Sequence, residues 1–165
     1  MKRIGVISDT HGWLDERVLA HLSSCDEIWH AGDIGSQEVA ERLTDFKPLK
    51  AVHGNIDGGI VRILYPEFLE FKCEDVVVLM THIGGYPKHY WPAAQRRIQQ
   101  THPQLFVCGH SHILKVQYDS SYSMLCLNPG AIGLSGFHQV RTLLRFEIDG
   151  NAIKNLEVIE IPKHA

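Results

Sequence analysis

The fold of this chain is decided by the stretch WHAGDIG, at residues 29–35. The apolar run before it, residues 27–29, is typical of the end of a short buried strand. Ser36 is a predicted N-cap for a helix over residues 36–43. Asp33 therefore lies where a strand gives way to a loop, at the carboxyl edge of a sheet, where open α/β folds bind ligands. We expect this carboxylate to belong to a functional site.

The composition is that of an ordinary globular protein. With 165 residues the chain is long enough for a substantial core, and we predict a single domain over residues 1–165. A net charge of −3 and an isoelectric point near 6.4 argue against a nucleic-acid partner. No apolar stretch approaches 18 residues, no signal-peptide pattern opens the chain, and the four cysteines show no C-x-x-C spacing. We therefore expect a cytoplasmic protein without membrane contact.

The first sixty residues alternate predicted strands and helices, an α/β pattern. Strands are predicted over residues 2–8, 27–29 and 48–52, and helices over residues 14–22 and 36–43, an order that favours a parallel layer. Asp9 and His11 follow the first strand, and Asn55 follows the third. We expect Asp9 and His11 to point the same way on an extended backbone.

From residue 60 the predicted strands become short and closely spaced, as in an antiparallel or mixed second sheet. They cover residues 61–64, 67–72, 76–81 and 105–107, followed by hairpins over 114–127 and 142–159, with one helix over 91–99. His82 follows the strand at 76–81. His110 and His112 follow the strand at 105–107, and two imidazoles two residues apart at a strand end are the most specific single signal in the chain.

The strand-end side chains form a set of oxygen and nitrogen donors without a thiolate: Asp9, His11, Asp33, Asn55, His82, His110 and His112. One ion takes four to six ligands, so seven donors indicate two divalent ions that share a carboxylate. Mixed carboxylate and imidazole ligands suit Mn²⁺, which we expect, or Zn²⁺, Fe²⁺ or Ni²⁺, better than Ca²⁺. Two ions about 3.5–4 Å apart are a typical device for phosphoester hydrolysis, because they bind phosphate oxygens and activate a shared water.

The same residues resemble the five ordered motifs of the calcineurin-like metallophosphoesterases. The matching elements are Asp9-x-His11, Gly32-Asp33, Gly54-Asn55, His82 and Gly109-His110-Ser111-His112, and the short length resembles the small bacterial and archaeal phosphodiesterase branch. The resemblance implies an α/β fold, a four-layer α/β/β/α sandwich of two mixed β-sheets. It further implies that one ion binds Asp9, His11 and His112, that the other binds Asn55, His82 and His110, and that Asp33 bridges the two.

The resemblance implies a dimetal phosphoesterase, and we expect a phosphodiesterase in which a metal-bridging hydroxide attacks phosphorus. Asp33, Asn55, His82 and His30 are its predicted catalytic residues. Ile56 stands where many members of the family carry a histidine proposed to protonate the leaving group, which disfavours monoesters. Four residues could substitute as an acid or support the ligands: His30, His53, Asp57 and His138. His30 is the first of them to test.

Two alternatives stay open at this point. The fold also serves as a non-catalytic protein-interaction scaffold in eukaryotic membrane-coat assembly, although the uninterrupted ligand set favours an enzyme. A phosphomonoesterase is the other alternative. The expected partner is a phosphoester small molecule or a nucleotide. The side chains that could stack on a base or sugar are Tyr86, His89, Tyr90 and Trp91, although surface packing or a subunit contact explains them equally well. A homodimer or homotetramer through residues 131–137 is compatible with the sequence.

Overall fold

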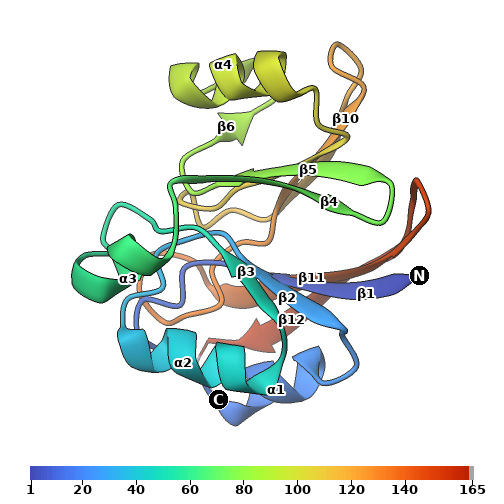
Figure 1. Cartoon of the computed structure of the whole chain (residues 1–165). Coiled ribbons are helices and arrows are strands. Elements are labelled where there is room, and N and C mark those ends of the chain that lie inside the picture. The colour runs from blue at the N-terminus through green and yellow to red at the C-terminus, as the bar shows by residue number, and fades with distance from the viewer. Residues whose placement is uncertain (164–165) are drawn as a thin grey trace.

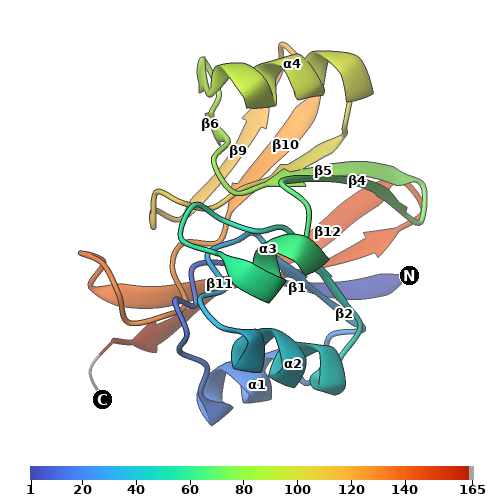
Figure 2. The ribbon, with the colours of Figure 1, turned by 60° about the vertical axis from the view of Figure 1, so that its left-hand side comes forward.

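The computed structural model describes residues 1–163 and arranges them in four layers (Figure 1). Two five-stranded sheets pack face to face. Helices α1 (Glu16–Leu22) and α2 (Gln37–Phe46) cover the outer face of the first sheet, and α4 (Pro92–Thr101) covers the outer face of the second (Figures 1 and 2). The expected α/β/β/α sandwich of two mixed sheets is confirmed. Within the described residues no helix has the length and apolar character needed to cross a membrane.

The first sheet has the strand order β12-β11-β1-β2-β3. Its parallel part consists of β1 (Lys2–Ile7), β2 (Glu27–His30) and β3 (Leu49–Ala51). The hairpin of β11 (Val140–Asp149) and β12 (Ala152–Pro162) adds antiparallel to β1. As expected, Ser36 caps α2, since its hydroxyl accepts the Val39 N–H at 3.3 Å. Helix α1 starts two residues later than predicted because Asp15 caps it.

The second sheet has the strand order β4-β5-β8-β10-β9. Its centre is the parallel group β5 (Val76–Thr81), β8 (Leu105–Val107) and β10 (Met124–Asn128). Its two edges, β4 (Phe68–Cys73) and β9 (Lys115–Asp119), run antiparallel to their neighbours. A two-stranded ribbon of β6 (Gly85–Tyr86) and β7 (His89–Tyr90) leads into α4.

The main core lies between the two sheets, around the fully buried Trp29. Its indole meets the ring of Phe71 from the second sheet edge-on at 5.0 Å and the ring of Phe146 from the first at 5.7 Å. Trp29 lies on β2, four residues before Asp33. The large aromatic contact therefore fixes the second sheet relative to the loop that carries Asp33.

The prediction of a strand over residues 61–64 is wrong, because this segment is part of helix α3 (Gly59–Leu64). Its β-branched residues favoured a strand, but short apolar runs do not separate the two states. Only Val61 is buried, while Ile60, Ile63 and Leu64 are exposed. The helix starts after an extended Gly58 and ends at Tyr65, which stays extended because a proline follows it.

Candidate metal centre

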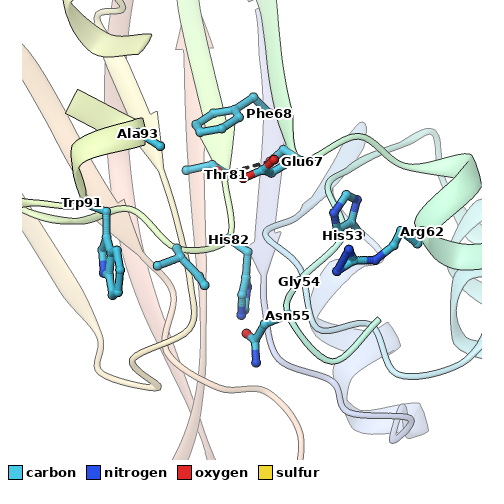
Figure 3. A pocket seen from close by; sticks show the side chains of 11 residues that line it. His53, Gly54, Asn55, Arg62, Glu67, Phe68, Thr81, His82, Trp91 and Ala93 are labelled. Carbon is cyan, nitrogen blue, oxygen red and sulfur yellow. Dashed lines mark hydrogen bonds between the residues drawn. The ribbon is translucent and has the colours of Figure 1, made fainter. Parts of the chain in front are cut away.

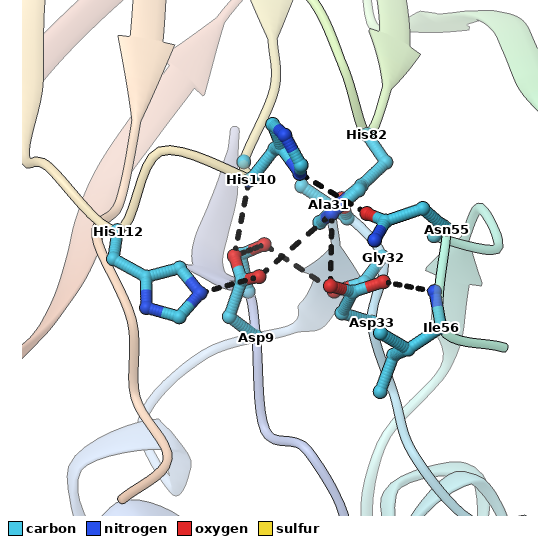
Figure 4. Close-up of polar contacts among 12 residues, drawn as sticks. Asp9, Ala31, Gly32, Asp33, Asn55, Ile56, His82, His110 and His112 are labelled. Carbon is cyan, nitrogen blue, oxygen red and sulfur yellow. Dashed lines mark hydrogen bonds and ion pairs between the residues drawn. The ribbon is translucent and has the colours of Figure 1, made fainter. Parts of the chain in front are cut away.

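All seven candidate ligands lie on loops that follow strands. These loops meet at one edge of the sandwich, where Figure 4 labels every candidate ligand except His11. Four of them follow strands of the first sheet: Asp9 and His11 follow β1, Asp33 follows β2 and Asn55 follows β3. The other three follow strands of the second sheet: His82 follows β5, and His110 and His112 follow β8. The two sheets are joined here by a hydrogen bond from the backbone N–H of His110 to Oδ2 of Asp9, at 3.2 Å.

The side chains fall into two groups. Asp9, His11 and His112 form one, and Asp33, His82 and His110 form the other; within each group the ligand atoms lie within 4.8 Å of one another. Asn55 joins the second group, with its Oδ1 3.0 Å from Nδ1 of His110. This division is the one that the family resemblance implies.

Asp33 lies between the two groups. Its Oδ2 is 3.1 Å from Nε2 of His82 in its own group and 3.4 Å from Nε2 of His11 in the other. The same His11 nitrogen is 3.4 Å from Oδ1 of Asp9. The carboxylate of Asp33 is therefore in contact with an imidazole of each group.

Three of the converging atoms are buried and have no hydrogen-bond partner within residues 1–163: Asp9 Oδ1, His11 Nε2 and His82 Nε2. His82 donates from Nδ1 to the carbonyl of Ala31 at 2.7 Å, so Nε2 carries the lone pair that faces Asp33. Leaving buried polar atoms unpaired costs about 1–3 kcal/mol each. Lone pairs that meet in this way fit divalent cations, and the residues present therefore suit the two ions that the donor set predicts.

The electrostatics keep both carboxylates charged. Burial alone would raise the pKa of Asp9, but the imidazoles of His11 and His112, 3.4 and 3.2 Å from its Oδ1, outweigh burial and hold that pKa far below its usual range. Burial would also raise the pKa of Asp33, which the contact with His82 lowers instead. The pKa of His82 is raised, because the attraction of Asp33 and Asp9 exceeds the effect of its burial. Ionised carboxylates are the form that binds metal.

Five of the seven candidate ligands have a left-handed backbone, which is uncommon outside glycine. The φ angles are 57° at Asp9, 47° at His11, 57° at Asp33, 72° at His110 and 63° at His112. The prediction that Asp9 and His11 converge on an extended backbone is therefore wrong. They converge through turns in which both residues are left-handed. These turns are held by hydrogen bonds from the Asp9 N–H to the Gly32 carbonyl and from the His11 N–H to the Asp33 carbonyl, both at 3.0 Å. Such strain of about 1–3 kcal/mol per residue is concentrated at functional sites.

A family model described as the calcineurin-like phosphoesterase superfamily domain matches residues 1–151. The chain belongs to this superfamily. The family recognised from the motifs is thereby confirmed, and it implies that the two groups of ligands take divalent ions.

This metallophosphoesterase chain is similar to other proteins both in sequence and in structure. A probable metallophosphoesterase of Methanocaldococcus jannaschii is 29% identical over 133 residues, which cover 78% of this chain and 67% of the relative. An archaeal phosphodiesterase has a similar structure, with a TM-score of 0.79, 18% identity and coverage of 96% and 99%. Vps29 from Entamoeba histolytica, crystallised with Zn²⁺, has a TM-score of 0.74, 15% identity and coverage of 98% and 99%. Both structural likenesses show the fold.

Asp57 ties the Asp33 loop to the Asn55 loop of the metallophosphoesterase centre. Its Oδ2 accepts the N–H of Gly54 at 2.8 Å and of Ile34 at 3.1 Å, and its Oδ1 accepts the N–H of Gly35 at 2.8 Å. The carboxylate is buried. Gly54 itself has no room for a side chain, because a Cβ would overlap the Asp33 carboxylate and backbone. Of the two roles left open for Asp57, acid and ligand support, the structure favours support.

His30 lies behind the centre and is completely buried. Its Nδ1 accepts the Gly32 N–H at 3.1 Å, and its Nε2 is 3.0 Å from Oγ1 of Thr10, which donates to the Ile34 carbonyl at 2.6 Å. Burial lowers the pKa of His30 to about 4. The imidazole is therefore neutral at pH 7 and holds the loops around Asp33, a position that favours support over proton donation.

Hollows lie on both sides of the metallophosphoesterase centre. One, of about 310 Å³, borders Asn55 and His82 (Figure 3). A second, of about 160 Å³, borders His110 and includes Tyr86 and Lys115. Trp91 lines both. A third, of about 500 Å³, extends from His110 and His112 to Phe137. The candidate ligands are thus bordered by three hollows.

The last two histidines considered as an acid also lie at these hollows. His53 lines the first, and its Nδ1 donates to the Tyr65 carbonyl at 2.8 Å. His138 lines the third, where its ring meets His112 edge-on at 5.5 Å and its Nε2 donates to the Gly133 carbonyl at 2.8 Å. In both cases one ring nitrogen is committed to the backbone, which fixes the ring beside the centre.

Proposed function

We propose that this chain is a phosphodiesterase that works with two divalent ions, Mn²⁺ being the natural one. The observation that carries the proposal is the position of Asp33 between the two groups of donors. In this proposal Asp9, His11 and His112 hold one ion, Asn55, His82 and His110 hold the other, and Asp33 contacts both.

When bound, the two ions would polarise a water molecule and the phosphoryl oxygens. The chain supplies the orientation. Asp9 and Asp33 stay ionised at neutral pH, and the Ala31 carbonyl keeps the Nε2 lone pair of His82 directed at the centre. Asn55 has its Oδ1 turned towards His110, which leaves its amide N–H groups to donate to a phosphoryl oxygen.

Two features favour a diester over a monoester. A diester carries two ester groups, and the hollows beside His82 and beside His110 offer separate space for each. Ile56 occupies the position of the expected acid, and its exposed side chain has no proton to give to a poor leaving group. Its backbone N–H instead donates to Oδ1 of Asp33 at 3.0 Å. The substrate would be a small phosphodiester or a nucleotide.

The test is hydrolysis of bis(4-nitrophenyl) phosphate beside 4-nitrophenyl phosphate, on chelator-stripped protein with Mn²⁺ added back. We expect diester turnover that requires the metal and falls by at least about 100-fold in Asp33→Ala, because a bridging ligand holds both ions. Asp149→Ala, at an exposed ion pair with Lys154, is the matched control. Preference for the monoester would contradict the proposal and would require another acid to replace Ile56.

A non-catalytic scaffold is the second candidate, and the similarity to the Vps29 fold is what favours it. Metal binding does not separate the two candidates, because that Vps29 was crystallised with Zn²⁺. Turnover does. Stoichiometric Mn²⁺ or Zn²⁺ binding without hydrolysis of either ester would favour the scaffold. A single domain over residues 1–165, a cytoplasmic location and a homodimer or homotetramer stay predictions.

A further inference from the structure

We infer that Arg62 forms an anion-binding subsite in the hollow beside Asn55, and that the substrate is a phosphodiester whose group on this side is a nucleotide with a second phosphate. This inference rests on the proposed function and specifies its substrate class. It is carried by the placement of Arg62, by the charges around it and by the aromatic side chain across the hollow.

Arg62 is held in place by the backbone and is otherwise free. It lies on α3, and its Nε donates to the carbonyl of Asp57 at 3.0 Å, the one hydrogen bond that its guanidinium makes within residues 1–163. Arg62 is exposed and lines the hollow. The two remaining amino groups of a guanidinium present a planar fork that matches a phosphate. The geometry therefore leaves a fixed cationic fork without an internal anionic partner.

The subsite faces the centre. Asp57, which anchors Arg62 through its carbonyl, follows Asn55 by two residues, and Asn55 and His82 line the same hollow (Figure 3). An anion bound by Arg62 would thus belong to a molecule whose other phosphate lies among the candidate metal ligands. A simple diaryl or dialkyl diester has no such second charge, whereas a nucleotide with a 3′- and a 5′-phosphate has one.

The opposite side of the hollow is aromatic. Figure 3 shows Trp91 across the hollow from Arg62 and His53. Trp91 is 53% exposed, so about half of its surface is not buried in the core. An exposed indole offers a stacking surface for a planar base. A volume of about 310 Å³ is at the lower end for small-molecule sites, which suits a single nucleotide rather than an oligonucleotide.

Glu67 sets the direction in which such a group binds. It lines the hollow beside Phe68 and Thr81 (Figure 3), and its carboxylate forms no ion pair with Arg62. Its carboxylate repels a phosphate and accepts hydroxyl or amino donors. The second phosphate is therefore directed to the Arg62 end.

The experiment uses two chromogenic diesters with the same leaving group: thymidine 5′-(4-nitrophenyl phosphate) with and without a 3′-phosphate. The quantity measured is the ratio of kcat/KM for the two substrates, with Mn²⁺ present. We expect the wild type to favour the 3′-phosphorylated diester by about tenfold, a typical effect of one charge-assisted contact. In Arg62→Met the ratio should fall to near one. Arg96→Met, at an exposed position on α4 away from the hollows, should keep the wild-type ratio.

Binding separates a failure of this inference from a failure of the proposed function. Calorimetry with thymidine 3′,5′-bisphosphate should give about tenfold weaker binding to Arg62→Met than to the wild type and to Arg96→Met, whether or not either diester is hydrolysed. Absence of turnover in the wild type would count against the proposed function only. An unchanged kcat/KM ratio in Arg62→Met, or equal bisphosphate binding by Arg62→Met and the wild type, would overturn the subsite.

Discussion

The most informative single substitution is Asp57→Asn, because it removes a charge that touches no substrate and no candidate ligand side chain. In the wild type one carboxylate accepts three backbone N–H groups from two loops, those of Ile34, Gly35 and Gly54, at 2.8–3.1 Å. The first two follow Asp33 and the third precedes Asn55. Asparagine has nearly the same shape but only one acceptor oxygen, and its amide group would face an N–H donor.

The cost follows from these contacts. If the asparagine oxygen takes the place of Oδ2, the N–H groups of Ile34 and Gly54 keep a neutral acceptor and lose about 0.5–1 kcal/mol each. The N–H of Gly35 then meets a second donor and stays unpaired in a partly buried place, at a cost of about 1–3 kcal/mol. The sum is a loss of about 3 kcal/mol in the free energy of unfolding.

Urea unfolding of the chelator-stripped protein measures this loss. With a denaturant slope of about 2 kcal/mol per molar urea, the midpoint should fall by about 1.5 M. Mn²⁺ affinity, measured by calorimetry on the folded variant, should fall by about 10- to 100-fold, as is typical when a group that orients metal ligands is lost. Asp149→Asn is the control, since that side chain is half-exposed and water screens its ion pair with Lys154. If Asp57→Asn unfolds and binds Mn²⁺ like Asp149→Asn, the supporting role of Asp57 is refuted.

Two further substitutions test the surroundings of Asp33. The pKa of His30 is about 4 when folded, against about 6.5 unfolded, so the unfolded state binds more protons between these values. The free energy of unfolding of the metal-free protein should therefore drop by about 3 kcal/mol as the pH falls from 6.5 to 4. His30→Gln should remove this part of the slope in urea titrations across that range, and an unchanged slope would contradict a buried neutral imidazole. Gly54→Ala places a Cβ on the Asp33 carboxylate and should lower diester turnover by at least about 100-fold. The control is Gly58→Ala, whose Cβ meets open space, so its free energy of unfolding should stay within about 0.5 kcal/mol of the wild-type value. Equal turnover in the two alanine variants would refute the close approach of Gly54 to Asp33.

The sequence predicted much of the fold because the relevant signals are local. The alternation of strands and helices before residue 60 indicated the parallel part of the first sheet, which β1, β2 and β3 form. The hairpin predicted over residues 142–159 corresponds to β11 and β12, which pair antiparallel. The strand predicted over residues 61–64 is wrong because three apolar residues around Arg62 fit a strand as well as one helical turn, and the segment buries only Val61.

The candidate site divides in the same way. By itself the sequence determined which residue types follow the strand ends. These residues identified the seven donors, and their resemblance to known motifs identified the family. Only the tertiary structure decided how close they lie, since Asp9 and His110 are 101 residues apart along the chain and meet through left-handed turns that composition does not encode. The support by Asp57 and His30 and the hollow beside Arg62 also depend on segments that contact each other only after the sheets pack. Local propensity acts over a few residues, whereas a binding site is made by long-range contacts, and these are fixed when the core around Trp29 forms.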